Sequence, residues 1–427
     1  MKSFALACCA AAVAAETVGD INFTSVGKIS VENPSFMHVK QWVDWMSTSD
    51  PYLFVTSFTG APGAGSVTIV PNLKEAVKAG DVSTLKGTKL DTGDNLKWPN
   101  DARMAPALAF EANRVIAVPD GFMVPGKQNG GVYLVHVSSD DMTKTIGTYK
   151  MTPDKEGYFY HMGQWVDLNG DGLLDYITAR SNGHPGEGQL VWFERPAGSF
   201  GLDGKEWTEH LITMGPDIGI EIDRLEAYPD EIVVWATQFF DQKLALYRVS
   251  TKDGSLVDSR IIDDTTILSA YSVSMEDLNG DGKKELLINN HEKDATKGGI
   301  FAYTVPEDIM TGSFDKFTLA TDFASKDLSP GFPYAVHPNG QKDGERAHIL
   351  VAGDDDDSAF LLTPTGDASK FEYEKDLITN VGGVVGALAT YDVDGDGWLE
   401  MFVPNYNDGY VEVFKMSAPA APTEFLQ

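Results

Sequence analysis

Residues 167–175 read Asp-Leu-Asn-Gly-Asp-Gly-Leu-Leu-Asp, and the same pattern returns at residues 277–285 and 392–400. In each copy, oxygen-bearing side chains stand at positions 1, 3, 5 and 9, with a glycine at position 6. A tight turn of this composition gathers hard oxygen ligands around a cation of the Ca²⁺ type. Each copy runs into a short apolar strand, so we expect three metal-binding turns that join strands.

An EF-hand loop has a similar spacing but fits less well. Its twelfth position requires a bidentate Glu, and the three copies have other residues there, namely Thr178, Ile288 and Val403. The flanking sequences also have the pattern of strands rather than of helices.

Short apolar strands recur along the whole chain at intervals of roughly 50 to 60 residues. Seven of them begin at Tyr52, Arg114, Asp175, Glu231, Glu285, His348 and Glu400. Each is followed by a turn and a further strand, and six of the seven units continue to a more polar strand. The seventh unit lacks that strand, but residues 21–31 form an unattached strand near the amino end. Four-stranded units at this period predict an all-β fold, a seven-bladed β-propeller whose last blade is closed by the N-terminal strand.

The predicted domain organisation has a signal peptide at 1–15, one propeller at 16–416 and a loose tail at 417–427. The blades are expected at roughly 36–92, 98–151, 158–214, 217–264, 268–321, 330–379 and 383–415, the last together with 21–31. Lys2 followed by the apolar run 4–14 has the pattern of a secretory signal, and both cysteines, Cys8 and Cys9, lie within it. We therefore expect a secreted or secretory-pathway protein without disulfides. Asn22 begins a glycosylation sequon, Asn-Phe-Thr.

Composition excludes several classes of function. The formal net charge of −30 at pH 7 opposes binding to nucleic acid and to anionic lipid. After the signal, no apolar stretch reaches the roughly 18 residues of a membrane span. The chain contains no Gly-x-Ser-x-Gly, P-loop or Rossmann glycine pattern and no ready-made zinc site. We therefore expect no organic cofactor.

The three turns resemble those of the FG-GAP and VCBS-type repeat propellers, which occur in integrin heads and in many secreted proteins. The resemblance implies up to three structural Ca²⁺ ions, each between the first and second strands of a blade. Most ligands are side chains, and position 7 offers its carbonyl. The residues that match are Asp167, Asn169, Asp171, Leu173 and Asp175; Asp277, Asn279, Asp281, Lys283 and Glu285; and Asp392, Asp394, Asp396, Trp398 and Glu400.

Function in a propeller is expected at the mouth of the central channel, on the loops opposite the metal turns. These loops are rich in aromatic residues and contain five of the eight histidines, which suits a small, partly apolar organic molecule. Our candidates for catalysis are His161, His184, Tyr160, Arg180 and Tyr334. Our candidates for substrate binding are His38, Trp98, Arg103, Tyr158, Phe239, His291 and Tyr406.

The first functional hypothesis is an enzyme of specialised metabolism. The chain is similar in architecture to stand-alone secreted fungal propellers, among them the hetero-Diels–Alderases of tropolone sesquiterpenoid pathways. The segments 189–196 and 207–212 also resemble the propeller part of aldos-2-ulose dehydratases. The resemblance implies loss of water from a hydroxymethyl-bearing ring and cycloaddition of the resulting diene to a terpene alkene. In this hypothesis a lyase or cyclase binds both molecules at the channel mouth.

The second hypothesis is a Ca²⁺-dependent binding or adhesion module without catalysis. Aromatic platforms with Asn and Asp groups also suit sugars, so the same loops would hold a glycan or a protein. Composition alone does not separate the two hypotheses.

Overall fold

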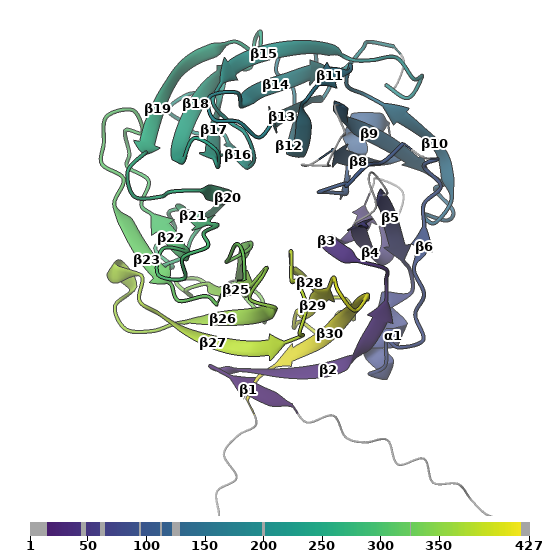
Figure 1. The fold of residues 1–427 in the computed structure, drawn as a ribbon, viewed down its shortest axis with the longest axis vertical. Helices are drawn as coiled ribbons and strands as arrows, with labels where there is room; N and C mark the ends of the chain where they lie inside the picture. Colours follow the sequence, from purple (N-terminus) through teal and green to yellow (C-terminus); the bar gives the residue numbers. More distant parts are fainter. Residues whose placement is uncertain are drawn as a thin grey trace, which may run out of the picture.

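The computed structural model describes residues 15–43, 48–59, 65–93, 95–111, 113–121, 129–198, 201–324 and 326–419. The predicted signal peptide, except Ala15, lies outside these residues, as do the last eight residues of the predicted tail. Seven antiparallel sheets stand around one axis (Figure 1), so the predicted seven-bladed β-propeller is confirmed. Within the described residues, no helix has the length and hydropathy needed to cross a membrane.

The first three blades follow the chain in order. Blade 1 consists of β3 (Pro34–Val43), β4 (Thr48–Phe58), β5 (Gly65–Val70) and β6 (Thr88–Lys89). Blade 2 consists of β7 (Arg103–Met104), β8 (Arg114–Asp120), β9 (Asn129–Val137) and β10 (Thr145–Lys150), with β11 (Lys155–Glu156) paired to β9. Blade 3 consists of β12 (Phe159–Val166), β13 (Asp175–Ser181), β14 (Gln189–Glu194) and β15 (Thr208–Met214).

The next three blades repeat the same order of strands. Blade 4 consists of β16 (Ile220–Asp223), β17 (Glu231–Gln238), β18 (Lys243–Ser250) and β19 (Leu256–Asp263). Blade 5 consists of β20 (Ala270–Glu276), β21 (Glu285–Asn290), β22 (Gly299–Tyr303) and β23 (Lys316–Ala320). Blade 6 consists of β24 (Pro333–Val336), β25 (His348–Ala352), β26 (Ser358–Pro364) and β27 (Tyr373–Asn380).

Blade 7 joins the two ends of the chain. It contains β28 (Ala389–Tyr391), β29 (Glu400–Asn405) and β30 (Tyr410–Ser417), and then β2 (Ile21–Ser30) from the amino end. The antiparallel register runs from Asn22 opposite Ser417 to Ser30 opposite Tyr410. The expected closing strand is therefore present, and β1 (Glu16–Val18) extends the same sheet by one more strand.

Burial explains why the second strand of each unit is the strongest sequence signal. Every residue of β8, β13, β21, β25 and β29 is buried, because both faces of each sheet pack against neighbouring blades. The outer strand β19 is largely exposed, and polar residues alternate there with exposed aliphatic ones such as Val257 and Ile261. The core is thus a ring of apolar clusters, and most of them lie between two adjacent blades.

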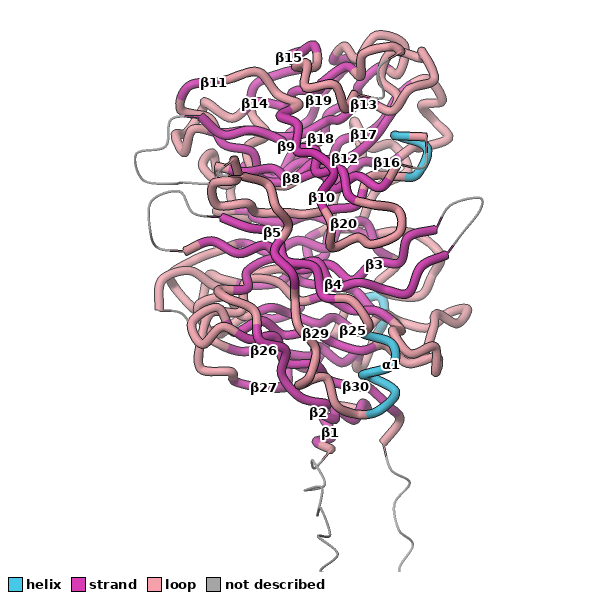
Figure 2. The backbone as a smooth tube through the Cα atoms, turned by 90° about the vertical axis from the view of Figure 1, so that its right-hand side faces the viewer, coloured by secondary structure: helices cyan, strands magenta, loops and turns pink. Residues whose placement is uncertain are grey.

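One short helix covers the junction between the first and last blades. Helix α1 (Leu73–Ala79) lies beside β2 at the outer edge of the ring (Figures 1 and 2). Leu73 and Val77 are buried in one apolar cluster with Val26 of β2. Two short 3-10 helices, η1 (Ala107–Phe110) and η2 (Ala368–Lys370), lie in loops.

We predict that Phe23→Ala, in the closing strand, destabilises the protein by about 3–5 kcal/mol. Phe23 is 2% exposed and packs in a cluster formed by blades 6 and 7, so its removal leaves a cavity at the closure. Chemical unfolding followed by tryptophan fluorescence measures the effect. The control is Leu377→Ala in β27, where the side chain is 51% exposed and the change should stay within about 0.5 kcal/mol. Equal effects of the two substitutions would contradict the role given to β2.

Candidate functional site at the channel mouth

Strand direction decides which loops meet at each end of the ring. In blade 3, Phe159 lies opposite Ser181 at one end of the β12–β13 pair, and Val166 lies opposite Asp175 at the other. The turn at residues 167–175 therefore lies at the end where Val166 and Asp175 pair. Blades 5 and 7 have the same strand directions, so all three acidic turns share one end of the ring. The loops between second and third strands gather at the opposite end.

A cavity of about 450 Å³ lies at this opposite end. Residues from every blade except blade 3 line it, including four of the predicted substrate-binding residues. The lining residues are Ser35, Phe36, Phe58, Trp98, Asn100, Ile218, Phe239, Phe240, Tyr271, His291, Leu328, Asp354, Val384, Gly386 and Tyr406.

Buried polar side chains hold the loops of the cavity in place. Asn405 donates from Nδ2 to the carbonyl of Val381 and accepts the backbone N–H of Asp408, which positions the loop that carries Tyr406. Asp217 accepts the backbone N–H groups of both Phe239 and Phe240, at 2.7 and 2.9 Å. Burial raises the pKa of Asp217 to about 7. These hydrogen bonds fix the loops that line the cavity.

One wall of the cavity consists of Phe58, Trp98 and Tyr406. Phe58 stacks on Trp98 with ring centroids 5.5 Å apart, and it lies 5.8 Å from the Tyr406 ring. The polar atoms of this wall are already in use, because Trp98 Nε1 donates to the carbonyl of Thr59 and the Tyr406 hydroxyl donates to the carbonyl of Phe58. Trp98 also has a left-handed backbone, with φ of 50°, which is unusual for so large a residue. The wall therefore presents ring surface to the cavity.

The second wall contains the one histidine among the residues that line the cavity. His291 stacks on Tyr271 at 4.8 Å, and its Nε2 lies 2.9 Å from Asp354 Oδ2. Burial raises the pKa of Asp354, and the neighbouring His291 opposes that shift. Asp354 is held by reciprocal backbone hydrogen bonds with Val385. The arrangement is a histidine–carboxylate pair set in an aromatic wall.

His161 lies beneath the cavity rather than in its wall. It is 1% exposed, contacts the rings of Phe36 and Phe332, and lies 3.3 Å from the hydroxyl of Tyr271. Burial lowers the pKa of His161 to about 4. This neutral imidazole is part of an aromatic layer that separates the cavity from the channel below.

The part of the channel below this aromatic layer contains three more candidate residues, namely His38, Arg103 and Tyr334. His38 Nε2 and Arg103 Nε contact the two oxygens of Asp101, at 2.6 and 2.7 Å. Burial lowers the pKa of His38, whereas Asp101 raises it. Arg103 and Tyr334 also line a channel space of about 260 Å³ together with the acidic residues Glu221 and Glu276. These three residues are thus absent from the lining of the 450 Å³ cavity and line a smaller cavity that shares Phe36 and Asn100 with it.

Three further candidates lie in or at the edge of blade 3, away from the cavity. Arg180 is 1% exposed and forms two hydrogen bonds to Glu209, at 2.7 and 2.6 Å, and a third to the hydroxyl of Tyr160. Burial raises the pKa of Tyr160 to about 12. Tyr158 accepts a hydrogen bond from Gln189 and lies under the Arg180 guanidinium. The ion pair occupies Arg180, so the predicted catalytic group of Tyr160 and Arg180 is not assembled at the cavity.

His184 is exposed on the loop after β13 and is absent from the residues that line the cavity. Sequence reasoning also missed Asn100, which follows Trp98 and Pro99 in the loop that leads to blade 2. Its amide type and its loop position were visible in the sequence, but its burial was not.

The three acidic turns share one hydrogen-bond frame. The carboxylate at position 1 accepts the N–H groups of both glycines, as Asp167 does from Gly170 and Gly172 at 2.7 and 2.9 Å. The position-9 carboxylate is buried and accepts the N–H of position 2, as Asp175 does from Leu168. The other two turns repeat these bonds, with Asp277 and Glu285 in one and Asp392 and Glu400 in the other.

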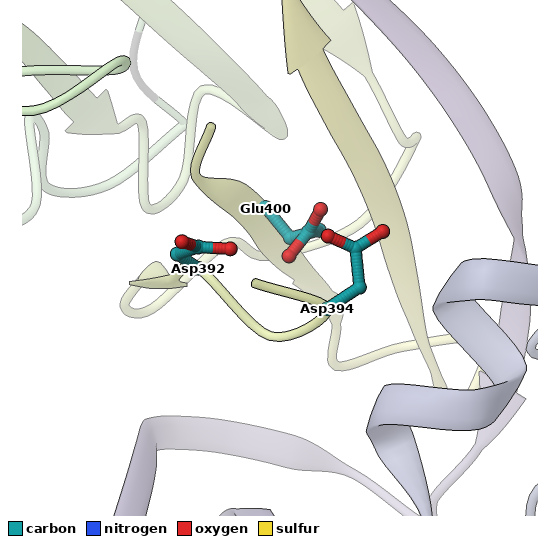
Figure 3. A group of neighbouring side chains, drawn as sticks. All are labelled: Asp392, Asp394 and Glu400. Carbon is teal, nitrogen blue, oxygen red and sulfur yellow. The ribbon is translucent and has the colours of Figure 1, made fainter. Parts of the chain in front are cut away.

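In the turn of blade 7, three carboxylates lie close enough together to hold one ion. Ligand atoms of Asp392, Asp394 and Glu400 lie within 4.8 Å of one another (Figure 3). Burial, together with the neighbouring carboxylates, raises the pKa of Glu400 to about 7. Lys415 Nζ lies 2.5 Å from Asp394 and 3.1 Å from Asp396, so an ammonium already offsets part of the negative charge.

Asn22 does not offer an exposed amide for a glycan. It is 9% exposed, and its Nδ2 donates to the carbonyl of Ala418 at 3.1 Å. The expected glycosylation at this sequon conflicts with that packing.

The fold is similar to those of solved propeller structures of low sequence identity. A structure of the Dos1 propeller aligns with 93% of this chain and 89% of its own, at 9% identity and a TM-score of 0.47. A chain in the S. cerevisiae structure of Dbp5 bound to Nup159, Gle1, IP6 and ADP aligns with 95% of this chain and 97% of its own, at 9% identity and a TM-score of 0.50. No protein-family model and no curated protein matches the sequence. At this identity the likeness shows the β-propeller fold alone.

We predict that His161 makes the protein less stable as the pH falls from 6.5 to 4. In this window the unfolded chain binds a proton at His161 and the folded chain does not, so stability falls by about 1.4 kcal/mol per pH unit. Unfolding of wild type and His161→Phe at pH 7 and pH 4.5 measures the effect, and the variant should lose less stability. His184→Ala, at an exposed histidine, is the control. The same acid sensitivity in His161→Phe and wild type would contradict the assignment.

Proposed function

We propose that the protein is an enzyme of small-molecule metabolism that acts on a mainly apolar, ring-bearing substrate in the channel-mouth cavity. The observation that carries the proposal is one cavity with aromatic walls, in which a histidine–carboxylate pair supplies acid–base groups. The volume of about 450 Å³ falls in the range of small-molecule sites. Secretion, inferred from the leader-like residues 1–15, is part of the same proposal.

The lining favours such a substrate over a glycan. A sugar needs many hydrogen-bond partners, whereas the polar atoms of Trp98 and Tyr406 are already bonded to backbone carbonyls. Most of the remaining wall consists of aromatic and aliphatic side chains. The alternative of a glycan-binding or protein-binding module therefore has less support.

The chemistry that suits the pair is loss of water from a hydroxymethyl group on a hydroxylated ring. His291 gives a proton to the departing hydroxyl, and the ring hydroxyl returns a proton to the imidazole, so that water and a quinone methide are the products. Asp354 Oδ2, 2.9 Å from His291 Nε2, is the carboxylate that accompanies the imidazole in this step. The aromatic walls then hold this diene against an alkene and exclude water during a hetero-Diels–Alder addition.

We predict that the wild-type protein accelerates the reaction of a tropolone alcohol with a humulene-type alkene, followed by mass spectrometry. His291→Gln should lower the rate by about 10²- to 10⁴-fold, because the amide cannot transfer the proton. His184→Ala should leave the rate unchanged, since that ring is exposed outside the cavity. A wild-type rate equal to the uncatalysed background rate would contradict the proposal for these substrates.

We also propose that the three acidic turns bind Ca²⁺ as structural sites. The donor set is of hard oxygens, and the position-9 carboxylates are buried beside other carboxylates, which a cation would stabilise. The residues that would hold the ions are those predicted from the repeat. In blade 7, Lys415 competes with the ion for Asp394 and Asp396.

Removal of Ca²⁺ by a chelator should lower Tm, because an ion that binds only the folded chain stabilises it by about 2.7 kcal/mol at 100 times its Kd. Excess Ca²⁺ should restore the original value. Lys415→Met removes the competing ammonium and should increase the response of Tm to Ca²⁺. Superimposable melting curves with and without Ca²⁺ would show that the turns do not depend on it.

A further inference from the structure

Asn100 is a buried amide without hydrogen-bond partners. Its side chain is 2% exposed, and among the described residues neither Oδ1 nor Nδ2 has a partner. The other buried amides near the cavity differ: Asn290 donates to two carbonyls and accepts one N–H, and Asn405 donates to the carbonyl of Val381 and accepts the N–H of Asp408. Nearly all buried polar groups in folded proteins are paired, so the unpaired amide of Asn100 needs an explanation.

The position of Asn100 connects it to the proposed substrate site. Asn100 is part of the wall of the 450 Å³ cavity and also of a small cavity of about 50 Å³ beneath it. Its backbone N–H donates to the carbonyl of Pro119, which fixes the residue against the end of β8. The amide thus stands at the inner end of the cavity, next to the aromatic layer of Phe36 and Phe332.

The other polar groups of the cavity are less suited to orient a ligand. Trp98 Nε1 and the hydroxyl of Tyr406 are bonded to backbone carbonyls, and the hydroxyl of Tyr271 contacts His161. His291 and Asp354 face each other. His291 Nε2 lies 2.9 Å from Asp354 Oδ2 but makes no hydrogen bond there, and Ser35 Oγ donates to the carbonyl of Asn33 at 3.4 Å. Asn100 is therefore the lining side chain whose donor and acceptor, on one planar amide, are both unpaired.

We propose that Asn100 is the specificity-determining residue of the cavity and that it selects ligands with a hydrogen-bond donor and acceptor on adjacent atoms. Lactams and α-hydroxyketones belong to this class. In the pair, Nδ2–H donates to the ligand carbonyl, and Oδ1 accepts the ligand N–H or O–H. This inference rests on the proposed function, in that it requires a ligand in the channel-mouth cavity.

Asn100 and a ligand of this class satisfy each other's hydrogen-bonding groups. A ligand without the donor leaves Oδ1 unpaired in an apolar surrounding, and this selects against it. The selectivity belongs to the binding step and is independent of proton transfer by His291.

Three bicyclic probes of similar size test the inference by equilibrium dialysis. 2-Quinolone has an adjacent N–H and C=O, 1-methyl-2-quinolone has only the acceptor, and naphthalene has neither. We expect wild type to bind 2-quinolone about 10- to 100-fold more tightly than the other two. Asn100→Leu, which has nearly the same size and no polar atoms, should bind all three with similar affinity.

Controls separate this inference from the proposed function. Asn339→Leu, an exposed change at the metal-turn end of the ring, should keep the wild-type preference. Asn100→Leu should melt at or above the wild-type temperature, because it removes an unpaired buried amide. Trp98→Ala should weaken the binding of all three probes, because it removes an aromatic side chain from the cavity wall.

Naphthalene binding that depends on Trp98, without any preference for 2-quinolone, would overturn the role of Asn100 and leave the proposed cavity function standing. A preference that persists in Asn100→Leu would overturn it as well. If none of the probes binds wild type, the cavity function fails and the inference fails with it.

Discussion

The antiparallel pairing of β2 with β30 is the interaction on which the rest of the structure depends. Both cysteines lie at positions 8 and 9, so within the described residues the ring is held without a disulfide. The pairing removes the free sheet edges that an open ring would expose. The cavity takes its lining from six of the seven blades, so its walls come together only when the ring is closed.

The sequence was sufficient to predict the architecture. The buried second strands are continuous apolar runs, because each is covered on both faces, and this makes the period easy to see. The three glycine-containing turns mark the same end of three blades. The unattached strand at 21–31 and the missing outer strand of the last unit together predicted the closure.

The candidate site was predicted only in part, because loop position does not give side-chain direction. Trp98, Phe239, His291 and Tyr406 line the cavity as expected. Successive residues of a strand point to opposite faces, and so Tyr160 packs between blades 2 and 3, whereas its neighbour His161 lies beneath the cavity.

The register of β2 with β30 also sets the order in which the protein is able to fold. Residues paired in this register, such as Asn22 and Ser417, lie almost 400 residues apart, and β30 follows the other strands of the ring in the chain. Pairings of such high sequence separation are slow to form. During synthesis, one apolar face of the first blade therefore stays uncovered until β30 has been made. In this interval the exposed face is prone to aggregation.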